Sequence, residues 1–413
     1  MTQFWKKKND DELKARVFAA LAKNVNYGEQ NVFGVPGSQL DEKVFHKDAS
    51  FLKDAPFLST LMENPNHIGC HTLELSEPFF GGTQEIEREL VEICACDILK
   101  GEPGQQDGYV ASGGTEANLQ AIWIYRNLFR ADLDADDRAI CILCSADSHY
   151  SVDKAANVLS IDIAKVPVDE ATREATDEAI ALEVNRLMAA GKRYFIVVAN
   201  MMTTMFGSVD RTGGYVKALK DAGAAYRIHV DGAYGGFYYP FADGAAMLDF
   251  SNPDVSSVTL DAHKMLQAPY GTGIFLARKG LMAYVITKEA RYVEGQDYTL
   301  IGSRSGANAV AVWMILMKNG PYGWREKIFV LQNRTQWLVG QLADAGIPHY
   351  RHPGSNIVVI RADAISRQLA EDHWLVPDNH DKPGWYKIVV MEHVTIEKLE
   401  PFVAALIAGP DKS

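Results

Sequence analysis

The sequence predicts an α/β protein with a mostly parallel central sheet and a smaller C-terminal α+β domain. Three observations support this prediction. Between Gly108 and Lys279, short runs rich in β-branched and aromatic residues alternate with helical stretches. These runs lack strict polar alternation, which indicates strands covered on both faces of a sheet. After Gly302, two long helical stretches precede a β-α-β-α pattern, which predicts the smaller domain.

The chain has 413 residues, enough for two or three domains. Residues 1–60 are predicted to form an N-terminal helical arm, residues 61–300 a large α/β domain and residues 301–413 the small domain. Within the large domain, a helix is expected to begin near Thr83. Glu85, Glu87 and Glu89 near its start suit the positive end of a helix dipole.

The strands of the large domain come next along the chain. They are predicted over the segments RAICILC, RYFIVVAN, YRIHVD, SSVTLD and GTGIFLAR. Helices are predicted between several of them, over DKAANVLSI, ATDEAIALEVNRLMAAGK and YVKALKDAG. Parallel sheets of this kind bind ligands beyond the carboxyl ends of their strands. The residues that follow each strand are therefore the candidates for a functional site.

Composition limits the partners of the protein. A net charge of −12 argues against a nucleic acid or an anionic membrane surface. The first residues, MTQFWKKKNDDELK, lack the apolar segment that a signal peptide needs, and no apolar run is long enough to span a membrane, so neither is expected. Cys94 and Cys96 lie in a predicted helix, and Cys141 and Cys144 in a predicted strand. Their apolar surroundings favour buried, reduced thiols, so we expect no metal site and a cytoplasmic location.

The segment YVASGGTEANLQA predicts a strand, a Gly-Gly turn and an amphipathic helix. Free backbone N–H groups at the helix start can bind a phosphate, which Gly113 and Gly114 allow to approach closely. Thr115 adds a hydroxyl. The Gly-Lys-Ser/Thr ending of a P-loop is missing. Taken alone, a Gly-Gly-Thr helix start is more often a simple tight turn.

Three further strand ends carry polar side chains: His149, Asp231 and a His-Lys pair that ends at Lys264. Each has an ordinary explanation by itself, since His149 could cap a helix and Lys264 could pair with Asp261 or Asp231. A carboxylate after an apolar run needs a cation or several donors. The small residues after Asp231, among them Ala233, leave space for a flat ring.

Together these groups match the requirements of pyridoxal phosphate (PLP). Its phosphate needs a helix N-terminus, and its ring needs two flat faces, which His149 and Ala233 can supply. Its pyridine nitrogen needs an anion, Asp231, and its aldehyde needs an amine, Lys264. The spacing between Asp231 and Lys264 allows one helix-and-strand crossover between neighbouring strands.

The segments YVASGGTEANLQA, SHYSVDKAA, HVDGAYGG and DAHKM resemble the group II PLP-dependent amino-acid decarboxylases. The resemblance covers most of the chain and extends to GSRSGANAVAVW and IVVMEHVTIEKLE. It implies a fold-type I PLP-dependent transferase-like fold and conversion of an L-amino acid to its amine and CO2. It also implies a homodimer with shared active sites. Diacids, aromatic amino acids, histidine and serine all remain open as substrates, with a slight preference for aromatic or acidic ones.

The resemblance assigns the catalytic roles residue by residue. Lys264 would form the Schiff base with PLP, and Asp231 would pair with the pyridinium nitrogen. His149 would stack on the ring and reach the substrate carboxylate, while Ala233 packs on the opposite ring face. In related enzymes a tyrosine on a mobile loop returns the proton, and Tyr292 is favoured here.

The remaining assignments concern the phosphate and the rim of the site. Gly114, Thr115 and His263 would bind the phosphate, and Ser303 of the neighbouring subunit would complete that site. Thr204 would lie near the ring hydroxyl and the substrate.

Three assignments keep alternatives. Tyr298 is the other candidate for the proton donor, and either tyrosine could be a packed loop aromatic. His67 and His71 fall where related enzymes shape the substrate pocket, and a structural role fits them equally well.

Other functions were weighed against decarboxylation. A carbon–carbon lyase acting on a phosphorylated amino alcohol needs a second basic phosphate pocket, and no clear cluster for one is found. An aminotransferase needs an arginine clamp, for which Arg304 and Arg361 are weak candidates. A non-catalytic scaffold subunit conflicts with the intact lysine, aspartate and histidine set. A nicotinamide-dependent dehydrogenase would need a GxGxxG segment, which is missing after the first strand.

Overall fold

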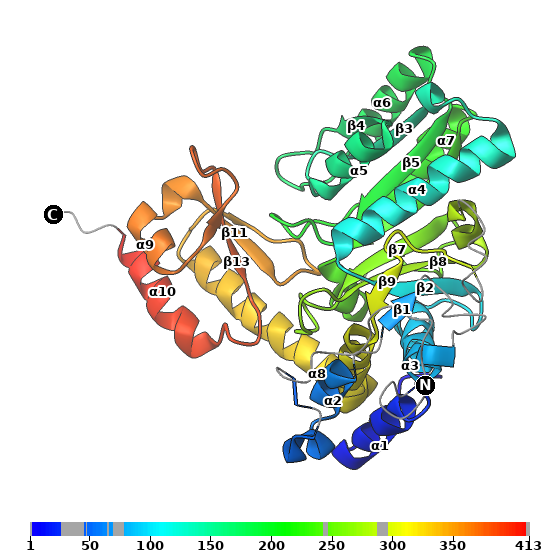
Figure 1. Ribbon diagram of the computed structural model, residues 1–413. Coiled ribbons are helices and arrows are strands. Elements are labelled where there is room, and N and C mark those ends of the chain that lie inside the picture. The colour runs from blue at the N-terminus through cyan, green and yellow to red at the C-terminus, as the bar shows by residue number, and fades with distance from the viewer. Residues whose placement is uncertain are drawn as a thin grey trace.

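The computed structural model describes residues 2–25, 45–46, 48–63, 66–68, 78–242, 247–286 and 296–409. A large lobe contains the main sheet, a small lobe contains the C-terminal elements, and the long helix α8 runs between them (Figure 1).

The large lobe is built on a seven-stranded sheet. In spatial order its strands are β2 (Gln106–Ala111), β8 (Gly273–Arg278), β7 (Val255–Asp261), β6 (Ala225–Gly232), β5 (Tyr194–Asn200), β3 (Ile140–Ser145) and β4 (Asp162–Val166). Strands β3 to β7 pair in parallel, whereas β8 is antiparallel to both of its neighbours. This arrangement confirms the predicted α/β class. Strand β4 was not predicted, because this edge strand mixes exposed and buried residues in a short run.

Helices cover both faces of this sheet. One face packs against α4 (Gly114–Leu133) and α5 (Ser151–Leu159), and the other against α3 (Gly81–Glu92), α6 (Asp177–Ala189) and α7 (Thr212–Asp221). Successive strand residues point to opposite faces, so Cys141 and Cys144 lie in different cores. These two thiols therefore cannot share a metal ion.

Helix α3 begins at Gly81, slightly before the predicted start at Thr83, and continues into a π-helical turn over Ile93–Ile98. That turn carries Cys94 and Cys96.

The small lobe has its own sheet and core. Its antiparallel strands, in spatial order, are β10 (His349–Tyr350), β11 (Ile357–Arg361), β13 (Trp385–Val389) and β12 (Val376–Pro377). They pack with α9 (Arg367–Asp372), α10 (Ile396–Ala408) and the second half of α8 (Gly306–Asp344). The two helices predicted here are the two halves of α8, which is interrupted at Gly320 (φ 64°) before Pro321.

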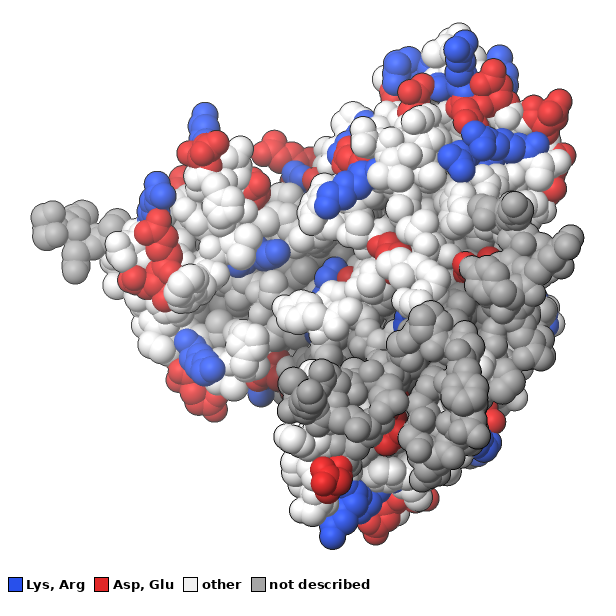
Figure 2. Space-filling model, in the orientation of Figure 1, with Lys and Arg blue, Asp and Glu red and all other residues white. Residues whose placement is uncertain are grey.

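The N-terminal region adds α1 (Asp10–Leu21) and α2 (Pro56–Met62), and β1 (Asn66–Ile68) pairs with β9 (Ser303–Ser305). Trp5 is buried and donates from Nε1 to the carbonyl of Leu316 at 2.6 Å, which fastens the N-terminus to α8. Charges of both signs are scattered over the face of the molecule seen in Figure 2. Among the described helices, none combines the length and apolarity that crossing a bilayer requires.

Candidate active site

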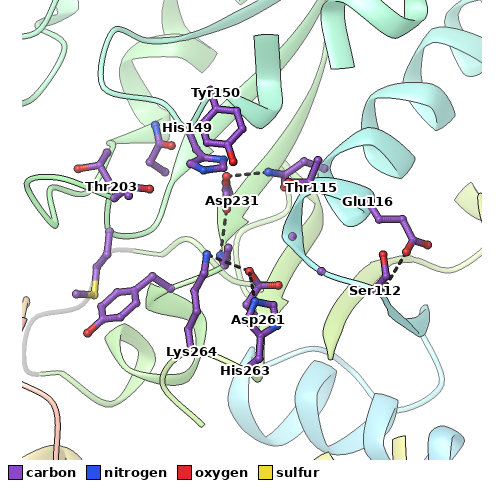
Figure 3. Close-up of a pocket in the computed structure, with 18 of the residues that line it drawn as sticks. Ser112, Thr115, Glu116, His149, Tyr150, Thr203, Asp231, Asp261, His263 and Lys264 are labelled. Carbon is purple, nitrogen blue, oxygen red and sulfur yellow. Dashed lines mark hydrogen bonds and ion pairs between the residues drawn. The ribbon is translucent and has the colours of Figure 1, made fainter. Parts of the chain in front are cut away.

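A cavity of about 500 Å³ opens at the carboxyl ends of β5, β6 and β7 and at the N-terminus of α4 (Figure 3). It lies where the strand-end rule places a ligand. Eight of the residues singled out from the sequence line it: Gly114, Thr115, His149, Thr204, Asp231, Ala233, His263 and Lys264. The fold therefore brings together groups that are far apart along the chain.

A glutamate stabilises the turn before α4 by accepting two hydrogen bonds. Glu116 accepts a hydrogen bond from the backbone N–H of Ser112 at 2.7 Å and another from the hydroxyl of Tyr109 at 3.0 Å. A Cβ on Gly114 would lie 2.9 Å from Asp261 Oδ2 and 3.1 Å from Ala233 Cβ, so only glycine fits without displacement. The start of a 20-residue helix thus borders the cavity with no side chain at this position.

Asp231 lies in the wall of the cavity and is 7% exposed. Its carboxylate accepts from Asn118 Nδ2 at 2.8 Å and from the backbone N–H of Ala233 at 3.1 Å. Among the described residues, two donors and no cation contact this buried carboxylate. Asn118 was not identified from the sequence. Its position four residues after Gly114, on the same face of a helix, is the signal that could have found it.

Lys264 reaches the cavity from the segment after β7. Its Nζ lies 3.0 Å from Asp261 Oδ2, and His263 Nε2 lies 3.7 Å from the same oxygen. The ion pair with Asp261 was one of the sequence alternatives for this lysine. In Figure 3, Lys264 and Asp231 approach the same space from opposite sides. The amine and the carboxylate can therefore contact one ligand.

His149 lies above Asp231, beside Tyr150 (Figure 3). Its Nδ1 accepts from the backbone N–H of Ser151 at 3.2 Å and lies 2.9 Å from the hydroxyl of that residue. The ring proton of the neutral histidine is therefore on Nε2. Burial lowers the pKa of His149 from its usual value; the charge of Asp231 opposes this shift, and that of Lys264 adds to it. The imidazole is mainly neutral at pH 7.

Other predicted residues lie elsewhere. Ser303 is an exposed residue of β9 and is not among the described residues that line the cavity. The side chain of Tyr298 points to Gln296, to which its hydroxyl donates at 2.6 Å, outside the cavity. His67 pairs in β1 with Arg304 of β9. Tyr292 and His71 fall outside the described residues.

Two residues that link the cavity to the small lobe were missed. Lys387 on β13 donates from Nζ to the carbonyl of Thr204 at 2.9 Å, and burial lowers its pKa, with the charge of Lys264 acting in the same direction. Tyr234 in the cavity wall donates to Asn356 Oδ1 at 3.0 Å. No local pattern could reveal these contacts, because they depend on how the two lobes pack.

The cavity fits PLP in charge and in available donors. Asp261 Oδ1 and His263 Nδ1 are buried and have no hydrogen-bond partner within the described part of the chain. Buried polar atoms are nearly always paired, so these two suit the polar groups of a ligand. A Cβ on Gly113 would lie 3.6 Å from His263 Cε1, which places that ring beside the helix start where a phosphate would bind. No group of three or more His, Cys, Asp or Glu side chains suited to a metal ion occurs among the described residues.

Comparison with known sequences points to one family. Residues 85–345 match the pyridoxal-dependent decarboxylase conserved domain. The chain is 50% identical over 402 residues to a tryptophan decarboxylase of Clostridium sporogenes, with 97% of this chain and 96% of that protein covered. It is 33% identical over 368 residues to a probable L-tyrosine/L-aspartate decarboxylase of Methanocella arvoryzae, with 86% and 94% covered.

Solved structures share the fold. An L-methionine decarboxylase variant from Streptomyces sp. 590 superposes with a TM-score of 0.73 at 20% identity, covering 97% of this chain and 94% of that one. The Oryza sativa TDC with PLP and tryptamine gives a TM-score of 0.72 at 15% identity, with 96% and 95% covered. The fold-type I architecture predicted from the sequence is confirmed.

Proposed function

Since the chain belongs to the pyridoxal-dependent decarboxylase family and is a PLP-dependent amino-acid decarboxylase, we propose that its preferred substrate is L-tryptophan. The observation that carries this proposal is the 50% identity to a tryptophan decarboxylase over 97% of the chain. Other aromatic L-amino acids are expected to be weaker substrates.

The lining of the cavity supports an aromatic substrate. Tyr150, Met202, Tyr234 and Tyr270 supply aromatic and apolar surface around the polar centre. Among the described lining residues there is no arginine, and the one lysine is Lys264. A diacid would place a second carboxylate here, and a carboxylate removed from water needs a cation or several donors.

The residues of the cavity have different proposed roles in binding and activating the cofactor. PLP supplies a carbonyl carbon that bonds the substrate amine and a ring that accepts the electron pair left at Cα. We assign Lys264 Nζ as the amine that holds the cofactor and yields to the substrate. The carboxylate of Asp231, with its two donors, is positioned to hold a proton on the pyridine nitrogen. The N–H groups at the start of α4, with Thr115 and His263, are positioned to bind the phosphate.

His149 and Lys387 are assigned to the substrate side. The neutral His149 ring presents its Nε2 proton, so it can stack on the cofactor and donate to a carboxylate. Burial, and after it the charge of Lys264, lowers the pKa of Lys387. The positive charge of protonated Lys387 can attract the substrate carboxylate toward the rim. Loss of CO2 is favoured where few polar groups solvate the departing carboxylate. Tyr292 remains the proposed donor of the proton to Cα, and Ser303 the proposed phosphate ligand from a second subunit.

Rival activities find less support in the described structure. Arg304 is buried against Glu87, and Arg361 lies over the ring of Trp385, so neither forms the clamp of an aminotransferase. A sphingosine-1-phosphate lyase of Burkholderia pseudomallei shares the fold at 18% identity and a TM-score of 0.67, which speaks for the architecture alone. The relatives named as aspartate decarboxylases make L-aspartate the main competing substrate.

A substrate screen tests the proposal. CO2 release is measured with added PLP for tryptophan, tyrosine, phenylalanine, methionine, aspartate and glutamate, each over a range of concentrations. We expect tryptophan to give the highest kcat/KM, by at least about tenfold over aspartate, which corresponds to about 1.4 kcal/mol. A higher kcat/KM for aspartate would overturn the substrate while leaving the decarboxylase activity in place.

The assembly and location are also proposals. We propose a homodimer because the resemblance to fold-type I enzymes implies that the GSRSG segment completes the site of a second subunit. Size-exclusion chromatography with light scattering tests it. The four described cysteines are all free, which supports a reducing, cytoplasmic environment.

A further inference from the structure

We propose that Asn118 is a positioning residue that couples two groups proposed to contact the cofactor ring, Asp231 at its nitrogen and His149 on its face, through a single buried amide. The inference rests on the proposed roles of Asp231 and His149. Asn118 is 1% exposed and lies on the first turns of α4, between the phosphate end of the cavity and the sheet.

The first step of the argument is the orientation of the amide. Asn118 Nδ2 lies 2.8 Å from Asp231 Oδ2 and 3.0 Å from Ser151 Oγ. A carboxylate oxygen can only accept, so the NH2 group of Asn118 must face it. The two hydrogens of that group then serve Asp231 and Ser151 at the same time.

The second step follows the bond to Ser151. Its hydroxyl accepts from Asn118 and is therefore free to donate its own proton to His149 Nδ1, at 2.9 Å. The backbone N–H of Ser151 donates to the same nitrogen. Asn118 thereby helps to keep the proton of the neutral His149 on Nε2, the nitrogen left to interact with a ligand.

The third step follows the other end of the amide. Asn118 Oδ1 must accept, so the Nε2 of His229, 2.9 Å away, carries a proton. His229 is fully buried and burial lowers its pKa to about 4, so it is neutral at pH 7. Its Nδ1 then accepts from the hydroxyl of Ser257 at 2.7 Å, and that hydroxyl can in turn accept from Tyr125.

These bonds form one chain in which every donor points toward the same carboxylate. The order is Tyr125, Ser257, His229, Asn118 and Asp231. Each bond polarises the next, so an aligned chain stabilises negative charge at its end. Because all members are buried, water cannot replace a missing donor at low cost. The chain therefore ends in a fixed donor to Asp231, the carboxylate proposed to pair with the pyridine nitrogen.

Two substitutions separate the parts of this role. Asn118→Leu removes the whole amide, whereas Asn118→Asp keeps its shape and its acceptor toward His229 but replaces the NH2 donors with a second carboxyl group against Asp231. Asn127→Leu is the matched control, because Asn127 lies on the same helix and donates to the carbonyl of Tyr284 at 2.8 Å, away from the cavity. Ser257→Ala breaks the chain at a residue that does not line the cavity.

Three quantities are measured for each variant. The dissociation constant of PLP comes from a titration. The visible circular dichroism of the bound cofactor, and kcat and KM with the best substrate of the screen, are measured with the variant saturated with PLP. We expect both Asn118 variants to lose roughly 10- to 100-fold in kcat, the usual effect of losing a hydrogen bond to a charged group, with KM changed less than about threefold. Their circular dichroism should change, because the ring loses a fixed partner. Ser257→Ala should lose about two- to fivefold in kcat, and Asn127→Leu should match the wild type in all three quantities.

Wild-type kcat and circular dichroism in the PLP-saturated Asn118 variants would overturn the inference. So would equal losses in Asn118→Leu and Asn127→Leu, since these would reflect α4 stability alone. If Asn118→Leu does not fold, the isosteric Asn118→Asp decides the matter. A wild-type protein that shows no cofactor band would instead remove the proposed roles of Asp231 and His149, and the inference with them.

Discussion

The guanidinium of Arg304 forms a buried ion pair with Glu87, its Nη1 lying 2.5 Å from Oε1. This pair joins the GSRSG segment to α3. Both residues also bond the main chain of Val110 in β2, as Oε1 accepts from its N–H at 2.7 Å and Nη1 donates to its carbonyl at 3.1 Å. The pair therefore fixes the strand that leads into the turn before α4, and neither residue is among the described residues that line the cavity.

Removing one partner of this pair should destabilise the fold strongly. Arg304→Met leaves the Glu87 carboxylate buried without its cation, which costs about 3–5 kcal/mol in the free energy of unfolding. Urea unfolding followed by circular dichroism measures the loss. The double variant Glu87→Gln with Arg304→Met should lose less than the two single variants together. Lys217→Met, which breaks an exposed pair with Asp221, should cost at most about 1 kcal/mol. Additive losses in the double variant would contradict the coupling.

Lys264→Ala should abolish turnover and covalent attachment of PLP. The lysine is the sole amine among the described residues that line the cavity. Reduction with borohydride followed by peptide mass spectrometry should place the cofactor on the peptide containing Lys264 in the wild type and on none in the variant. CO2 release should fall by at least about a thousandfold, as expected when a covalent nucleophile is lost. Labelling of another lysine in the wild type would refute the assignment.

Gly114→Ala should weaken PLP binding without unfolding the protein. The added methyl would lie 2.9 Å from Asp261 Oδ2 and 3.1 Å from Ala233 Cβ, at the point where the ring and phosphate must approach the backbone. A displacement of this kind costs about 1–3 kcal/mol, so the dissociation constant of PLP should rise roughly 5- to 150-fold. Gly213→Ala is the control, since nothing lies within 4 Å of its added methyl. Equal PLP affinity in the two variants would show that the space at Gly114 is not needed.

The sequence allowed the polar centre of the site to be predicted because its parts lie at strand ends. Asp231 and Lys264 each follow an apolar run, and the order of such runs determines where their ends meet. The helix start at Gly114 is equally local. These features depend on patterns a few residues long, which a single sequence displays.

The supporting contacts could not be predicted in the same way. The helical spacing from Gly114 could have pointed to Asn118, but its bond to Asp231 depends on how α4 packs on the sheet. Lys387 reaches Thr204 from another lobe. Such contacts depend on the distances between helices and strands. The local pattern of apolar residues along the chain gives no information on those distances. Strand β4 was missed for a related reason, because an edge strand buries too little to show a regular apolar pattern.

His229 should make the stability of the fold depend on pH. Burial lowers the pKa of this histidine from 6.5 to about 4. The neutral form therefore takes part in the series of hydrogen bonds that ends at Asp231. When folding lowers the pKa of a group, that group contributes its full stabilisation to the free energy of unfolding at pH values above its pKa in the unfolded chain. That contribution declines as the pH falls below 6.5 toward about 4, because the unfolded chain takes up the proton first. Between pH 7 and pH 5 the loss is about 2 kcal/mol in the free energy of unfolding.

The comparison of wild type with His229→Asn isolates the contribution of His229 to the pH dependence of the free energy of unfolding. The variant is less stable at pH 7 because it breaks the hydrogen-bond chain, but its free energy of unfolding should fall by about 2 kcal/mol less between pH 7 and pH 5. His352, whose pKa burial also lowers to about 4, contributes equally to both proteins and cancels in the difference. Asn127→Leu, which removes a hydrogen bond of α4 and no titratable group, should keep the wild-type slope. Urea unfolding at the two pH values measures all three proteins. If the free energy of unfolding changes equally with pH in wild type and His229→Asn, His229 takes up its proton equally well in the folded and unfolded chains. The assignment of His229 as a neutral donor to Asn118 would then be wrong.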